Sequence, residues 1–182
     1  MRRPVTTVCL AALLVSLAAS AGELPAPPAG FSWHAVPQIN GSVLVPDGWS
    51  VRDDHDGTTL TLFVTEKPAT PPADFDVGLT MSAFVGDANA PEKVKKSLDE
   101  IAAKFSVMLT NSTQGRFHLL ACKFDSPRKK DGVVIRTYEL GIANPDTRTS
   151  YLLVFESPVS RWDQTWPKAE EILNHLSLDS DL

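Results

Sequence analysis

Two apolar runs separated by a turn dominate the hydrophobic pattern of the chain. Residues 133–142 and 151–156 are rich in β-branched and aromatic side chains, and Asn144-Pro145-Asp146 lies between them. Such runs around a polar, proline-containing connection predict a β-hairpin. The second run is apolar on both of its faces, which predicts a strand that is covered on both sides or lies at the centre of a sheet.

Shorter alternations of apolar and polar residues predict further strands on either side of this hairpin. The expected strands are, in chain order, residues 31–36 (a first edge strand), 42–45, 49–51, 59–65, 77–83 and 117–122. The dipeptide Asp56-Gly57 predicts a tight hairpin turn. Polar or proline-containing stretches predict connections without regular structure at residues 67–74, 109–115 and 126–132.

Helical periodicity appears first at residues 91–105. Four apolar side chains recur there at the spacing of one helix face, namely Val94, Leu98, Ile101 and Phe105. Asn89 is expected to cap this helix, with Glu92 completing a box-like spacing and Pro91 tolerated in the first turn. The apolar stripe predicts that the helix packs on the sheet.

A second helix is expected near the end of the chain. Its apolar side consists of Ala169, Ile172, Leu173 and Leu176. Residues 160–163 resemble a capping box, whereas Pro167 favours a helix start near Thr165 or Trp166. The order strands, helix, three strands, helix predicts an α+β fold, in which amphipathic helices pack on an antiparallel β-sheet.

Three features give residues 40–178 a resemblance to a known family: the corner at residues 45–49 (VPDGW), the helix at 91–105 and the terminal helix after Phe155. The chain resembles the Mog/PsbP-like α/β/α sandwich, and within that group the bacterial DcrB-like exported envelope proteins. The resemblance implies a non-enzymatic accessory or binding role. It carries over no functional residue, because no family functional motif matches here.

The N-terminal residues have the marks of a secretory signal peptide, with Arg2 and Arg3 before an apolar segment at residues 5–19 and small residues up to Ala21. The apolar segment is too short to cross a bilayer comfortably, so we expect cleavage near Ala21, the alternative being a permanent N-terminal anchor. Cleavage would make the protein periplasmic or secreted, with at most peripheral membrane contact. The expected divisions are a signal peptide (1–21), a proline-rich linker with the edge strand (22–39) and a single α+β domain (40–182).

Removal of residues 1–21 takes away two arginines, which leaves 15 basic against 22 acidic residues and a net charge of −7. A surface of this sign disfavours polyanionic partners and argues against nucleic-acid binding. The remaining 161 of the 182 residues are enough to bury a sizeable core. Cys122 is then the one cysteine left, so an internal disulfide is excluded.

Residues that could ligate a metal gather at one place in the sequence, namely Asp53, Asp54, His55 and Asp56. Hard carboxylates with one imidazole would suit manganese, calcium or zinc. The calcium-loop pattern fails, because aligning Gly57 with its invariant glycine places Arg52 and Phe63 at the first and last ligand positions. The alternative is a solvated hairpin tip, where Asp and Gly are favoured for backbone reasons.

The four tryptophans indicate a second candidate binding site: Trp33, Trp49, Trp162 and Trp166. Either all four pack in the core or at its edge, or one or two line a groove for a peptide or an apolar ligand. The histidines His34, His118 and His175 are scattered singly without ligand-like spacing, and each is expected to face solvent or to be satisfied in the core.

Two further features have a structural and a functional interpretation. Cys122 shares strand parity with Leu120 and Phe124, so a buried inert thiol is expected, the alternative being a redox or intermolecular role. The basic run at residues 128–130 is expected to be a solvated loop, the alternative being a contact with anionic headgroups or an acidic partner.

No nucleophile elbow, zinc-helix motif, CxxC pair or phosphate-binding glycine loop occurs in the sequence. We therefore assign no catalytic residue, no cofactor and no metal ligand. The leading interpretation is a small exported accessory or binding protein without catalytic activity, acting on another cell-envelope protein or process. The alternatives are a periplasmic ligand- or metal-binding protein that uses residues 53–56 or a tryptophan-lined groove, and a hydrolase with a dispersed site.

Overall fold

The structure is a computed structural model that describes residues 24–57, 59–69 and 75–178. The predicted signal peptide (1–21) and residues 70–74 of a predicted connection lie outside the described residues. Within the described part of the chain, no helix has the length and apolar character needed to span a bilayer.

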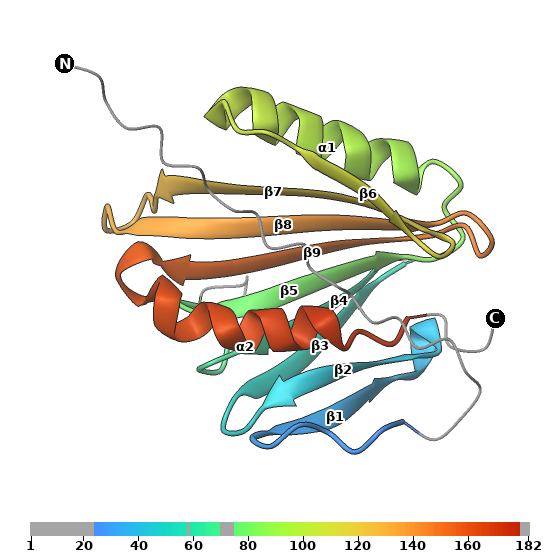
Figure 1. Cartoon of the computed structure of the whole chain (residues 1–182), viewed down its shortest axis with the longest axis horizontal. Helices are drawn as coiled ribbons and strands as arrows, with labels where there is room; N and C mark the ends of the chain where they lie inside the picture. Colours follow the sequence, from blue (N-terminus) through green and yellow to red (C-terminus); the bar gives the residue numbers. More distant parts are fainter. Residues whose placement is uncertain (1–23, 58, 70–74, 179–182) are drawn as a thin grey trace.

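An antiparallel sheet forms the centre of the fold. Its seven strands among the described residues follow the order β3-β4-β5-β9-β8-β7-β6 (Figure 1). They are β3 (Ser50–Asp56), β4 (Thr59–Thr65), β5 (Gly78–Phe84), β6 (Thr110–Gln114), β7 (Phe117–Pro127), β8 (Val134–Asn144) and β9 (Thr149–Pro158). The predicted hairpin is confirmed as β8 and β9, which pair from Asn144↔Thr149 to Ile135↔Pro158. β9 is the fourth strand of the order, at the centre of the sheet, as its apolar faces predicted.

A small hairpin lies apart from the main sheet. β1 (Phe31–Val36) and β2 (Gly41–Pro46) pair antiparallel and are joined by a 3-10 turn at Pro37–Ile39. A strand was predicted at residues 31–36, and the division of the chain at residue 39 stays a prediction. β2 also meets the segment after the last helix, because the backbone N–H of Ser42 donates to Ser177 O at 2.9 Å.

Helices lie on both faces of the sheet, so the fold is α+β, as predicted. α1 (Ala90–Phe105) packs mainly on β7, β8 and β9. α2 (Trp162–Asn174) follows a 3-10 turn (Val159–Arg161) and packs together with β2 on the opposite face (Figure 1).

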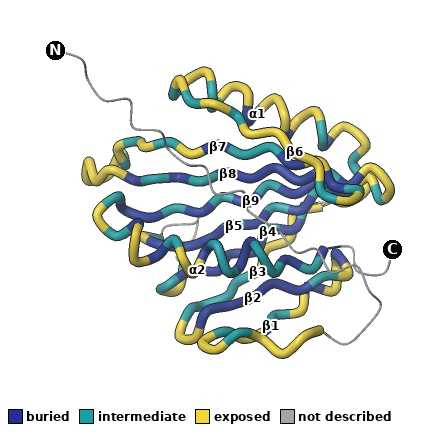
Figure 2. The backbone as a smooth tube through the Cα atoms, in the orientation of Figure 1, coloured by how far each residue is buried: buried dark blue, intermediate teal, exposed yellow. Residues whose placement is uncertain are grey.

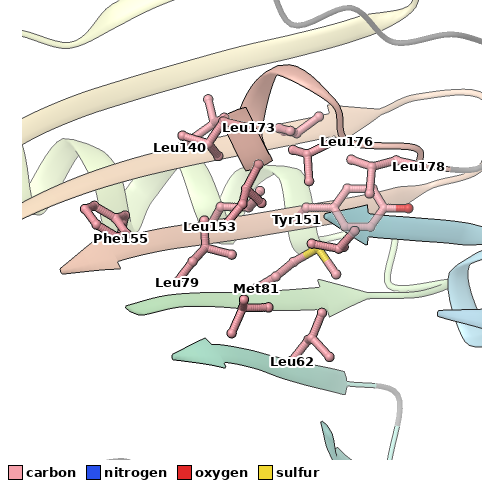
Figure 3. Packing of buried hydrophobic residues seen from close by; sticks show 14 of the residues in the cluster. Leu62, Leu79, Met81, Leu140, Tyr151, Leu153, Phe155, Leu173, Leu176 and Leu178 are labelled. Atoms are coloured by element: carbon pink, nitrogen blue, oxygen red, sulfur yellow. The ribbon is translucent and has the colours of Figure 1, made fainter. Parts of the chain in front are cut away.

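The larger part of the core lies between the sheet and α2. Side chains from β4, β5, β8 and β9 meet those of α2 and of the segment after it (Figure 3). On β9 these are Tyr151, Leu153 and Phe155, each at most 1% exposed. Burial of each such side chain contributes about 1.5–3 kcal/mol before conformational entropy is subtracted.

A smaller cluster lies under α1. Val94 and Leu98 are buried against Cys122, while Ile101 and Phe105 are half-buried, so the predicted apolar stripe does face the sheet. Gly141 permits this close approach, because a Cβ atom there would lie 2.7 Å from Val94 Cγ1 and 2.9 Å from Leu98 Cδ1.

The prediction of a turn at residues 109–115 is wrong. Residues Thr110–Gln114 form β6, the edge strand that pairs with β7. Its first four residues are exposed, as the tube in Figure 2 shows. A strand at a sheet edge needs only backbone partners on one side, so it can form without the apolar alternation that reveals inner strands.

The predicted helix starts are partly wrong. α2 begins at Trp162 with Pro167 inside it, and neither Arg161 nor Asn89 makes a side-chain capping bond. Pro167 is tolerated because it removes one helical hydrogen bond, to the carbonyl of Asp163, a residue that is exposed to water. In the turn before α1, Asp87 Oδ1 accepts from Asn89 N at 2.9 Å, which orders this turn but does not cap the helix.

Candidate functional site

The two faces of the sheet differ in how completely they are covered. On β5, Leu79 and Met81 face α2 and are fully buried, whereas Thr80 and Ser82 face the α1 side and are half-buried. β9 alternates in the same way. Because α1 packs mainly on β7, β8 and β9, the α1 side of β3, β4 and β5 is left partly exposed.

We call this partly exposed surface the threonine face. It consists of side chains from five strands on the α1 side of the sheet: Arg52, Asp54, Asp56, Thr59, Thr61, Phe63, Thr80, Ser82, Val154, Glu156 and Glu139. Directly paired residues project to the same side of a sheet. Thr80, Val154, Glu139 and Cys122 therefore form one row across β5, β9, β8 and β7.

Glu139 is the chemically unusual member of this face. Among the described residues it is the one charged residue that is buried, with 7% of its surface exposed. Its Oε2 atom is buried without a hydrogen-bond partner. Burial, and then the charge of Glu156, raise the pKa of Glu139 to about 7.

Glu156 is the neighbour of Glu139 on the next strand. Glu139 stands opposite Val154, and Glu156 stands opposite Thr137, so the two glutamates are diagonal neighbours across β8 and β9. Burial raises the pKa of Glu156, and the nearby charge of Arg128 partly opposes that effect. Two carboxyl groups with raised pKa values thus lie beside α1 on the same face.

Cys122 stands opposite Glu139 on its other side and is buried, as predicted. Burial, followed by the negative charge of Glu139, raises the pKa of the Cys122 thiol to about 11. The thiolate is the nucleophile in cysteine chemistry, so this environment suppresses reactivity.

We expect the Cys122 thiol of the native protein to react with Ellman's reagent at pH 8 at least about 100-fold more slowly than after unfolding in urea, because the group is both buried and protonated. The rate of thionitrobenzoate release in the two conditions measures this. Native labelling as fast as that of the unfolded chain would show that the thiol is accessible and reactive.

The acidic turn forms the end of β3. Strand geometry places Asp53 and His55 on one side and Asp54 and Asp56 on the other, and all four residues are exposed. No group of three or more His, Cys, Asp or Glu side chains that could hold a metal ion occurs in the part of the chain that the structure describes. The alternation along the strand places these side chains in two pairs on opposite sides of β3.

The tryptophans do not gather around one groove. Trp162 and Trp166 stack at 4.9 Å between ring centroids on the α2 side, and Trp162 is 5% exposed. Trp49 is half-buried, with Lys168 Nζ 5.4 Å from its ring centroid. Trp33 donates its indole N–H to Pro25 O at 2.8 Å. These contacts correspond to the packing interpretation.

The basic run departs from the predicted solvated loop at its first residue. Arg128 Nη1 lies 2.6 Å from Asp76 Oδ1, and its Nη2 lies 2.6 Å from Asp131 Oδ2. Arg128 thereby connects the β7–β8 loop to the segment before β5, whereas Lys129 is exposed as expected. Of the histidines, His118 is exposed, His34 is half-buried, and His175 Nδ1 lies 3.0 Å from Glu171 O.

Sequence reasoning missed Glu139 and Glu156. A signal was present, because each is an acidic residue inside or at the end of one of the two most apolar runs. Neither residue belongs to a motif, and only the pairing register of β8 with β9 shows that the two are neighbours.

No protein-family model and no curated protein matches the sequence. Solved structures do match. A crystal structure from Bacteroides thetaiotaomicron is 14% identical (TM-score 0.46), and the match covers 76% of this chain but only 44% of that one. A Pseudomonas aeruginosa protein of unknown function is 13% identical over 78% of this chain and 94% of that one (TM-score 0.39).

A solution structure of cyanobacterial PsbP from Synechocystis is 11% identical, with a TM-score of 0.44, and covers 87% of this chain and 97% of that one. The matches thus include a PsbP, the family whose α/β sandwich the sequence resembles. At these identities the likeness concerns the fold alone. The narrower likeness to DcrB-like proteins stays a prediction.

Proposed function

We propose that this chain is an exported, non-catalytic accessory protein that binds another protein of the cell envelope through the threonine face. The observation that carries this proposal is the unequal covering of the sheet. One face is sealed by α2 and the β1–β2 hairpin, while the other presents half-exposed hydroxyl and carboxyl side chains beyond α1.

The composition of the face supports binding rather than chemistry. Its central positions are Thr61, Thr80 and Ser82, with half-buried Val154 beside them. Hydroxyl groups beside an apolar side chain suit a protein contact that mixes hydrogen bonds with buried apolar area. The thiol in the same row as Glu139, that of Cys122, is buried. Export is motivated by residues 1–21, and a negative net charge favours a protein partner over nucleic acid.

Site-specific photo-cross-linking in cells of the source organism tests the proposal. A photoreactive amino acid at Ser82, on the threonine face, is expected to yield a discrete adduct with an envelope protein. The matched control is Lys96, on the outer side of α1, whose side chain is 78% exposed. No adduct above background is expected there, because position 96 points away from the face.

Equal adducts from both positions, or none from Ser82 and none from Thr80, would contradict the proposal. The full chain is used in this experiment, so the size of the product on the same gels reports whether residues 1–21 are removed, and fractionation of the cells before electrophoresis reports whether the product lies outside the cytoplasm.

A further inference from the structure

Glu139 presents an unsatisfied charge at the boundary of the threonine face. A buried carboxylate oxygen without a hydrogen-bond donor costs free energy that the fold does not recover from its own groups. Its direct neighbours are Val154 on β9 and Cys122 on β7, and neither is a cation. The lysines of α1 have other contacts: Lys93 pairs with Asp87, Lys95 with Asp99 and Lys96 with Glu100, and Lys104 lies over the Phe105 ring.

The net charge of the threonine face is negative. Asp54, Asp56, Glu139 and Glu156 are acidic, against the single cation Arg52. Arg52 lies over the Phe63 ring at 4.4 Å from its centroid, at the far end of the face from β8. Arg128, whose charge acts on Glu156, is already paired with Asp76 and Asp131, and Glu139 Oε2 has no hydrogen-bond partner.

A positively charged side chain with an apolar stem fits the surface beside Glu139 and Glu156. Lysine and arginine have alkyl stems that lie along apolar surface and heads that form charge-assisted hydrogen bonds with carboxylates. Half-buried Val154, opposite Glu139 and two residues before Glu156 on β9, offers such a surface. A metal ion fits less well, because the described residues contain no group of three acidic, His or Cys ligands.

We propose that the threonine face receives a lysine- or arginine-bearing segment of the partner protein, whose cationic head pairs with Glu139 and Glu156. This proposal rests on the proposed function and specifies the chemistry of its partner. The segment neutralises the buried carboxylate, so the energetic cost of Glu139 in the free protein is offset in the complex.

Calorimetric titration with tetralysine, at pH 8 and low salt, tests the pairing on the purified protein. Glu139→Gln is expected to weaken tetralysine binding about tenfold or more, as for the loss of a charge-assisted hydrogen bond. Glu156→Gln should also weaken tetralysine binding. The matched control Glu100→Gln removes an equal charge from the outer side of α1, where the side chain is 68% exposed, and should change the affinity less than about twofold. Tetra-acetyl-lysine should not bind.

Loss of binding in Glu139→Gln cannot be a folding failure if, as expected, this variant is more stable than the wild type. Affinities of Glu139→Gln and Glu156→Gln within about twofold of the wild type would overturn the proposal. So would an equal loss in Glu100→Gln, which would indicate attraction to net charge alone.

The cross-link at Ser82 separates this proposal from the one on which it rests. An adduct that persists at full yield in Glu139→Gln would leave the proposed function standing and refute the basic segment. Missing adducts at both Ser82 and Thr80 in the otherwise unaltered chain would refute both.

Discussion

Raising the pH from about 4.5 to about 7 is expected to lower the free energy of unfolding by about 3 kcal/mol through Glu139 alone. The sign follows from which state binds the proton more tightly. Folded Glu139 has a pKa of about 7 against 4.5 for an ordinary glutamate, so between these values the folded state holds a proton that the unfolded state has released. The stabilising proton is fully bound at low pH and is lost as the pH rises through about 7.

Urea denaturation at several pH values between 5 and 8 measures this dependence. The free energy of unfolding of Glu139→Gln should change less with pH over this range than that of the wild type, and should be higher at pH 8. The control Glu100→Gln should behave like the wild type. The pKa of Glu156 is also raised, so its proton affects stability in the same direction as that of Glu139. Some pH dependence of stability therefore remains in Glu139→Gln. A wild type and a Glu139→Gln variant with equal stability at pH 8 would contradict the burial of an ionised carboxylate.

Other titrating groups change the stability outside the range from about pH 4.5 to about pH 7. Arg161 lowers the pKa of Glu66, and Arg128 lowers that of Asp76, so their stabilising ion pairs are lost only as the pH falls below the ordinary range of carboxyl groups. The raised pKa of Cys122 keeps its thiol protonated up to pH 8. Stability is therefore expected to be greatest near pH 5 and to fall on both sides.

The architecture could be predicted because its inner elements have apolar patterns of the right period. β8, β9 and α1 bury one or both faces, so their apolar side chains recur at the spacing of a strand or a helix. β6 could not be predicted in this way, since Thr110–Gln114 is held at the sheet edge by backbone pairing with β7. The start of α2 was misplaced because the burial of Trp162 outweighs the single hydrogen bond that Pro167 removes.

The candidate site could be predicted only in its separate parts. The acidic residues and tryptophans were visible in the sequence, but strand alternation separates Asp53 and His55 from Asp54 and Asp56. Glu139 and Glu156 lie 17 positions apart in the sequence and become neighbours through the register of two strands. The energetic cost of burying Glu139 also depends on how far α1 extends across the sheet, and no local sequence pattern encodes that extent.

Trp162→Ala is expected to lower the free energy of unfolding by about 3–5 kcal/mol, the range for truncating a large aromatic residue in a core. Trp162 packs edge-on against Phe155 at 5.5 Å between ring centroids and stacks on Trp166, and the Arg136 guanidinium lies 5.6 Å from its ring centroid. Its removal leaves a cavity between α2 and the sheet that the surrounding side chains close only partly. Chemical denaturation at pH 5, where Glu139 is protonated, measures the loss without the pH effect described above.

The matched control is Trp33→Ala, at a half-buried position where the indole makes one hydrogen bond to Pro25 O. That variant should cost about 1 kcal/mol, the value of one such bond, together with a modest loss of apolar contact. The comparison decides between the two interpretations of the tryptophans. If Trp162 lined a ligand groove, its truncation would leave stability nearly unchanged, whereas a core residue must show the full loss because both aromatic partners are left facing a void.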